Sequence, residues 1–226
     1  LGHARSGGRP GSTTSFSSAL ADIVVGIEHE PASQRHGGLA MPADMAREAD
    51  GTLHVAYYDY TERHLRYARR TPGGLWETEQ VDQSTAYTGT YASIAVDSAG
   101  TVHIAYYDDS TDDLKYVAGT LGAWQTPQVV DSTGSVGLYT SIVLDEYKTP
   151  YVAYYDASQT NLKFAQKVGN TWLTETVDNA NANGMYAAVA YDAKGKIFHI
   201  AYRAGTALRY VRGKPGAWKL PVNVDT

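Results

Sequence analysis

Three aspartates recur at equivalent places in the sequence. Asp59, Asp108 and Asp156 each end an apolar, aromatic run that closes in Tyr-Tyr-Asp. A carboxylate after a strand can accept hydrogen bonds from the hydroxyl groups of a ligand, or it can cap a turn by bonding its own backbone. Both roles suit these positions, so the sequence leaves both open for each residue.

Three tyrosines recur beside those aspartates. Tyr91, Tyr139 and Tyr186 each follow a long polar connection that ends in a glycine. Flat rings next to hydrogen-bonding carboxylates are what saccharide binding needs, because a sugar offers an apolar face and a rim of hydroxyls. Tyr also fills gaps between packed sheets. We nevertheless take the three aspartates and the three tyrosines as the candidate ligand-binding residues.

The histidines and the N-terminal acidic residues are weaker candidates. His54, His103 and His199 fall inside a predicted strand, and Tyr151 stands where a fourth is expected, which breaks any ring of imidazoles that could hold a metal. A hydrogen-bonded core role is the better interpretation. The cluster at 28–36 places its carboxylates and imidazole on opposite faces of an extended segment. We therefore predict neither a metal nor a cofactor.

Composition excludes several functional classes. The net charge of −5 lacks the basic excess of a general nucleic-acid binder. Cysteine is absent from the 226 residues, so no disulfide framework exists. No apolar run approaches the length of a membrane span. No nucleophile elbow, zinc-protease motif, P-loop or dinucleotide fingerprint occurs, and we therefore predict no catalytic residue.

The candidate residues sit on an internal repeat. Equivalent positions His54, His103, Tyr151 and His199 are spaced by 49, 48 and 48 residues, and four tryptophans follow the same period. A period in this range indicates a repeat architecture. Each unit has four short alternating segments separated by Gly, Asp and Ser turns, which predicts a four-stranded antiparallel meander. In its second strand, residues 102–107, both faces are apolar, so both must be covered by neighbouring units.

The best copy is the block Ile94-Ala-Val-Asp-Ser-Ala-Gly-Thr-Val-His-Ile-Ala-Tyr-Tyr-Asp108. It resembles the core of NHL-type and related propeller repeats. The Tyr-Tyr-Asp triplet and the fourth-strand tryptophan depart from that pattern and are closer to Tyr- and Trp-rich lectin propellers. The resemblance spans about 190 residues and implies an all-β fold: a β-propeller of four-stranded blades.

We expect residues 1–18 to be a flexible tail or linker and residues 19–226 to form the propeller. The repeats occupy about 37–82, 83–131, 132–178 and 179–226. The favoured architecture is a ring of four blades, with an apolar strand at 21–27 as a strap across its closure. The alternative is a ring of five or more blades, in which residues 23–30 belong to a further blade.

The expected function is non-catalytic glycan binding through the Tyr- and Asp-rich loops of one face. The alternative is a protein-interaction scaffold. A polysaccharide hydrolase or lyase is less favoured: two placed carboxylates such as Asp108 and Asp109 or Asp156 are available, but no copy breaks the repeat as a catalytic site does. The expected partner is a saccharide or a protein, with no nucleic acid and no membrane span, and the chain as a monomer or small homo-oligomer. We expect secretion or cell-surface display.

Overall fold

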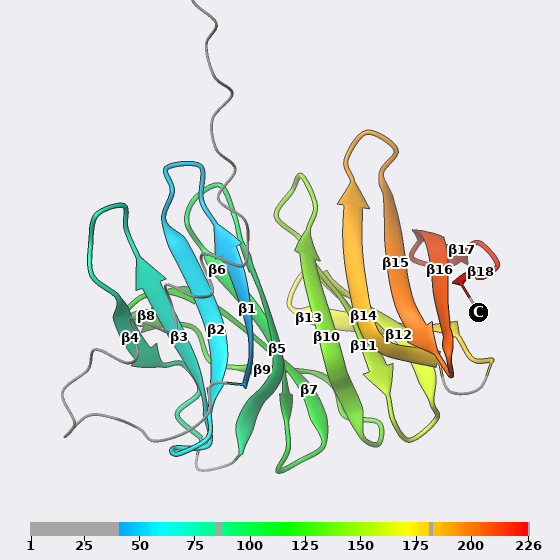
Figure 1. The fold of residues 1–226 in the computed structure, drawn as a ribbon, viewed down its shortest axis with the longest axis horizontal. Coiled ribbons are helices and arrows are strands. Elements are labelled where there is room, and N and C mark those ends of the chain that lie inside the picture. The colour runs from blue at the N-terminus through cyan, green and yellow to red at the C-terminus, as the bar shows by residue number, and fades with distance from the viewer. Residues whose placement is uncertain (1–40, 85–86, 181–182, 226) are drawn as a thin grey trace, which may run out of the picture. The chain divides into compact units, whose positions relative to one another are not determined.

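A computed structural model describes residues 41–84, 87–180 and 183–225, and within them every regular element is a β-strand (Figure 1). The strands form four antiparallel sheets, called blades 1 to 4 here in chain order. Each sheet lies inside one sequence repeat. The strap or extra blade strand expected at 21–30 lies outside the described residues, as does the tail expected at 1–18.

The blades share one strand order. Blade 1 contains β1 (Met41–Arg47), β2 (Leu53–Asp59), β3 (His64–Arg70) and β4 (Glu77–Gln80). Blade 2 contains β5 (Thr88–Val96), β6 (Val102–Asp108), β7 (Asp113–Thr120), β8 (Ala123–Trp124) and β9 (Gln128–Asp131). Blade 3 contains β10 (Val136–Leu144), β11 (Pro150–Asp156), β12 (Asn161–Val168) and β13 (Thr171–Asp178). Blade 4 contains β14 (Asn183–Asp192), β15 (Ile197–Ala204), β16 (Ala207–Lys214), β17 (Ala217–Trp218) and β18 (Val222–Asp225).

The fourth strand of a blade is not always continuous. In blades 2 and 4 it is split into β8 with β9 and β17 with β18, both pieces pairing with the same third strand. The breaks fall at Pro127 and Pro221. Proline has no N–H to donate to the ladder, so it interrupts the pairing. Blade 3 has no proline there, and β13 runs unbroken.

The core lies between the blades. Every residue of β6 is buried, as the two apolar faces predict. Val102, Ile104 and Tyr106 pack toward blade 1, whereas Ala105 packs toward blade 3. A third cluster joins blades 3 and 4. The first strands β1, β5, β10 and β14 contact one another in that order. Within the described residues, no strand pairing joins blade 4 to blade 1.

A buried hydrogen bond joins each of blades 2, 3 and 4 to the blade before it. The Tyr106 hydroxyl donates to Asp82 Oδ2 at 2.7 Å, and the Tyr154 hydroxyl donates to Asp131 Oδ2 at the same distance. The donor is the first tyrosine of the Tyr-Tyr-Asp triplet. The acceptor Asp131 ends the outer strand of blade 2, and the acceptor Asp82 lies two residues after the outer strand of blade 1. Burial raises the pKa of Tyr106, which therefore keeps its proton. Tyr202 and Asp178 repeat the bond.

Tryptophan makes a second link between blades. The Trp124 ring meets Tyr67 edge-on at 5.0 Å between centroids, and its Nε1 donates to Glu79 at 2.6 Å. Trp218 repeats both contacts, with Phe164 and with Glu175. Outer-strand tryptophan therefore packs between blades.

The first strands are linked by backbone amides that bond to side chains of the previous blade. The amide of Ile94 donates to Asp44, and the amide of Ile142 donates to Ser93. The amide of Val189 donates to Ser141. Together with the tyrosine and tryptophan links, these bonds set the spacing between blades along their whole width.

We predict that Tyr106→Phe lowers the free energy of unfolding by about 1–3 kcal/mol, because Asp82 stays buried and its Oδ2 loses the tyrosine donor. Urea denaturation measures the change. Tyr60→Phe is the matched control, since Tyr60 is 47% exposed. Equal denaturation midpoints for the two variants would contradict the role given to the bond.

Candidate functional site

The three predicted tyrosines share an unusual backbone conformation. Tyr91, Tyr139 and Tyr186 have φ angles of 52°, 53° and 53°. This left-handed region is strained for a residue with a large side chain, at a cost of about 1–2 kcal/mol each. All three lie at register shifts, where the first strand bulges away from the second. Bulges redirect side chains, and here the same redirection occurs in three successive blades.

The rings of these residues touch across the blades. Tyr139 lies 4.7 Å from Tyr91 and 4.3 Å from Tyr186 between ring centroids, so the three form a row, called the tyrosine row below. Tyr186 is 59% exposed, whereas the other two are half-buried. Burial, with the neighbouring tyrosine hydroxyls, raises the pKa of Tyr139, which keeps its proton and can donate or accept a hydrogen bond.

Close backbone approach holds the row in place. Gly137, two residues before Tyr139, has φ of 104°, and a Cβ there would lie 2.8 Å from Leu114 Cα of the preceding blade. The adjacent amide of Val136 donates to the carbonyl of Asp112 at 3.0 Å. Only glycine permits this contact, so the strand that carries each tyrosine is fastened to the previous blade at its start.

Blade 1 departs from the pattern. Aligning the bulged strands puts Pro42 at the position of the tyrosines, and proline cannot take a positive φ. The row therefore begins at blade 2.

The three predicted aspartates are used by their own loops. Asp59 Oδ1 accepts the amides of Thr61 and Glu62. Asp156 Oδ1 accepts the amide of Gln159 at 2.9 Å. Both residues therefore cap turns, which is one of the two roles that the sequence allowed. Asp59 is half-exposed, whereas Asp156 is buried.

Asp108 is buried and carries an additional ion pair. Its carboxylate accepts the Ser110 amide and lies 2.5 Å from Lys115 Nζ. Burial alone would raise the pKa of Asp108, but the Lys115 ammonium and the Ser110 hydroxyl outweigh it and lower that pKa. An ionised, paired carboxylate is poorly suited to act as a general acid.

Two exposed tyrosines near these loops were missed by the sequence analysis. Tyr87 is 45% exposed, with the Arg63 guanidinium 4.7 Å from its ring centroid. Tyr60 is 47% exposed and packs edge-on against Tyr58. Tyr60 directly follows Asp59 in the chain, and the carbonyl of Tyr87 accepts the amide of Asp109, the residue after Asp108. Because neither position recurs in other copies, comparison of the repeats gave no signal for them.

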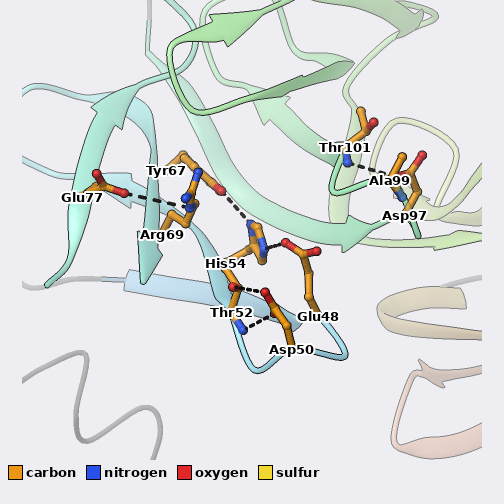
Figure 2. A network of polar contacts seen from close by, with 10 residues as sticks. All are labelled: Glu48, Asp50, Thr52, His54, Tyr67, Arg69, Glu77, Asp97, Ala99 and Thr101. Atoms are coloured by element: carbon orange, nitrogen blue, oxygen red, sulfur yellow. Dashed lines mark hydrogen bonds and ion pairs between the residues drawn. The ribbon is translucent and has the colours of Figure 1, made fainter. Parts of the chain in front are cut away.

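The histidines bond to tyrosines of their own blades. His54 Nδ1 lies 2.6 Å from the Tyr67 hydroxyl, and its Nε2 lies 2.8 Å from Glu48 (Figure 2). His103 and His199 make the same bond to Tyr116 and Tyr210. The hydrogen-bonded core interpretation is therefore confirmed for His54 and His103, which are buried, whereas His199 is half-buried.

The surroundings of His103 shift its pKa. Burial lowers its pKa to about 4, and the distant ammonium groups of Lys148 and Lys167 act in the same direction. The Asp97 carboxylate, 4.0 Å from Nε2, opposes the shift without cancelling it. His103 is therefore neutral at pH 7.

In the described part of the chain, no group of three or more His, Asp or Glu side chains has the arrangement of a metal site. The same residues contain no helix with the length and apolarity needed to cross a membrane.

No family model and no curated protein matches the sequence. Solved structures match the fold. A fucoside complex of the Aleuria aurantia lectin has a TM-score of 0.57 at 14% identity, over 81% of this chain and 60% of the lectin. An exo-β-1,3-galactanase from Phanerochaete chrysosporium has a TM-score of 0.54 at 9% identity, over 80% and 49%. A PL25 ulvan lyase has a TM-score of 0.60 at 12% identity, over 82% and 55%.

At these identities the likeness shows the fold alone. The chain spans about half to three fifths of the length of these neighbours. The lectin is described as a six-bladed β-propeller. Four sheets of this order, packed face to face and superimposing on such proteins, give this chain the β-propeller fold, and its structural neighbours are carbohydrate-related proteins.

We predict that His103→Gln removes part of the acid sensitivity of the fold. The folded pKa is near 4 and the ordinary value is 6.5. The unfolded chain therefore takes up the proton first, and the stability present above pH 6.5 is lost as the pH falls from 6.5 to 4, by at most about 3 kcal/mol.

Urea denaturation at several pH values between 7 and 4 should give a shallower slope for His103→Gln than for the wild type. A lost bond to Tyr116 shifts the whole curve and leaves its slope unchanged, so the two effects separate. Parallel curves across this window would show that His103 does not titrate as described.

Proposed function

We propose that the chain is a non-catalytic, lectin-like propeller that binds a glycan along the tyrosine row. The observation that carries this proposal is that Tyr91, Tyr139 and Tyr186 all adopt the same strained conformation at a bulge, with their rings in contact. Local strain that recurs at one place is typical of functional positions. Neighbouring rings of the row are inclined by 66° and 44°, so in this proposal successive sugar units stack on separate rings.

Polar groups beside the row supply hydrogen bonds. Thr90 donates to Asp109 at 2.7 Å, and the Tyr107 hydroxyl lies 3.1 Å from the Ser135 hydroxyl. Tyr107 is also 6.2 Å from the Tyr91 ring. In this proposal the half-exposed Asp59 has a carboxylate oxygen available to a sugar hydroxyl, whereas Asp108 and Asp156 mainly shape the loops. The structural neighbour from Aleuria aurantia is a lectin in complex with fucose-containing saccharides, which supports a saccharide as the ligand.

We predict that Tyr186→Ala weakens glycan binding about three- to tenfold, the range expected for one lost aromatic contact. An array of neutral oligosaccharides identifies the best-bound sugar, and calorimetry then compares the variants. Leu173→Ala is a matched control, because Leu173 is also 59% exposed but lies in β13.

Two outcomes would overturn the proposal. One is an array on which no sugar binds, together with a single stoichiometric protein partner in a pull-down, which would favour the scaffold alternative. The other is equal affinity of Tyr186→Ala and Leu173→Ala for the sugar.

The number of blades in the ring stays a prediction, and a larger ring than the favoured four blades has the better support. Leu65, Leu114 and Leu162 are fully buried, each where the next blade meets its sheet. Leu208, the equivalent residue of blade 4, is 44% exposed. The superposition on a six-bladed lectin over 61% of its length points the same way. A ring of more than four blades is consistent with both observations.

We predict that Leu208→Ser changes the free energy of unfolding by less than about 0.5 kcal/mol. Leu162→Ser, at the covered equivalent position, should cost about 2 kcal/mol or more. Urea denaturation of both variants makes the comparison. A similar loss in both would support closure of four blades on themselves.

A further inference from the structure

A cavity between blades 3 and 4 lies away from the tyrosine row. Its volume is about 310 Å³, and its lining includes Tyr151, Gln166, Tyr191, Lys196, Phe198 and Lys214. Tyr186 of the row and Tyr191 of the cavity belong to the same strand, β14, five residues apart. At about 3.3 Å per residue they are about 16 Å apart along the strand. The cavity therefore opens beside the turns at the other end of the blade.

The cavity residues depart from the repeat. The ladder pair Tyr191 and Phe198 of blade 4 stands where blade 2 has the pair Val96 and Val102. Two aliphatic side chains are thus replaced by two rings. Tyr151 likewise stands where blade 2 has a histidine.

One polar residue of the lining departs from it as well. Lys214 stands where blade 2 has Thr120, whereas Gln166 occupies a position that is also polar in blades 1 and 4, where it is Arg69 and Arg212. Structural residues are copied by a repeat together with its fold. The ring substitutions and Lys214 occur only at this junction and therefore need an explanation of their own.

The rings form one apolar wall. The Phe198 ring lies 4.4 Å from Tyr151 and 4.9 Å from Tyr191 between centroids. Phe198 is buried, whereas Tyr191 is half-buried and its ring can be reached from the cavity. A wall of this kind suits the flat face of a sugar ring.

The acidic groups near the wall are already engaged. Glu146 accepts the Tyr191 hydroxyl at 2.5 Å and lies 2.9 Å from Lys196 Nζ. Asp145 accepts the amides of its own turn and the Tyr151 hydroxyl at 3.1 Å. The positive charge of Lys196 is therefore largely balanced by Glu146.

Unlike Lys196, Lys214 has a positive charge that no described carboxylate balances. It is exposed, and within the described residues it has no carboxylate within ion-pairing distance. An ammonium group beside an aromatic wall and the Gln166 amide can recognise an anion attached to a ring.

We infer that this cavity is a second binding site, for a saccharide unit that carries an anionic group such as a carboxylate. The sugar ring stacks on the wall formed by Tyr151, Tyr191 and Phe198. Its anionic group reaches Lys214, and Gln166 bonds a neighbouring hydroxyl. The site is separate from the tyrosine row and does not depend on it.

The test compares two pairs of sugars that differ only at carbon 6. Methyl glucuronide and methyl galacturonide carry a carboxylate, and methyl glucoside and methyl galactoside do not. NMR titration of the full chain measures their affinities. We expect a uronide to bind more tightly than its neutral counterpart. Lys214→Gln should lower its affinity about fivefold, the upper range for one partly exposed charge pair, and remove the preference.

Two further variants localise the binding. Tyr191→Val restores the residue type of blade 2 and should abolish binding of the uronide. Lys219→Gln removes an exposed charge from the same blade outside the cavity and should leave binding unchanged.

Several results would overturn the inference. They are absence of binding by both uronides, equal affinity for the neutral sugars, or an equal loss in Lys214→Gln and Lys219→Gln. Loss of uronide binding in Tyr186→Ala would place the ligand in the tyrosine row instead. Tyr186→Ala with normal uronide binding but no neutral glycan binding separates the two sites.

Discussion

The structure depends on one interaction that repeats between blades: a buried tyrosine hydroxyl that donates to an aspartate of the preceding blade. The second strand packs against other residues on both faces, so each of its buried polar groups needs a partner, and the first tyrosine of the triplet finds its partner in the preceding blade. Asp82 and Asp131 provide that partner, and in blade 3 Lys163 also pairs with Asp131. Burial opposes ionisation of Asp131, but Lys163 and Tyr154 hold its pKa below the usual value. The bond therefore links residues of two neighbouring blades that are 24 and 23 positions apart in the sequence.

The same close approach explains the candidate site. Because successive blades are held tightly, the strand that enters each blade must pass the previous one at a glycine, as Gly137 passes Leu114. The strand then bulges to recover its register, and the bulge places Tyr139 at a positive φ. The strain of the tyrosine is thus offset by packing elsewhere in the blade. The ring row is a consequence of how the blades join, and this gives it a fixed geometry for a ligand.

Much of the fold could be predicted from the sequence because the copies of the repeat can be compared with one another. Period, strand order and the burial of both faces of β6 followed from copies of one block. The broken outer strands could also have been predicted, since Pro127 and Pro221 are visible in the sequence. The left-handed tyrosines could not, because a bulge depends on packing against the next sheet. Nor could the pairing of Asp108 with Lys115 be separated in advance from a role toward a ligand.

Residues that are the same in all copies of a repeat do not distinguish a structural role from a functional one, whereas a residue that differs in one copy indicates a local role. Agreement among Tyr91, Tyr139 and Tyr186 is explained equally by packing and by ligand binding, so comparison of the copies does not separate the two roles. The junction of blades 3 and 4 is the opposite case, since Phe198 differs from the equivalent residues of the other copies in the amino-acid sequence itself. The fold brings the residues that differ from the repeat together, because those of blades 3 and 4 line one cavity. They supply aromatic rings and an ammonium group that lacks a carboxylate partner among the described residues. Here the larger rings of Tyr191 and Phe198 leave a cavity of about 310 Å³ open beside Lys214.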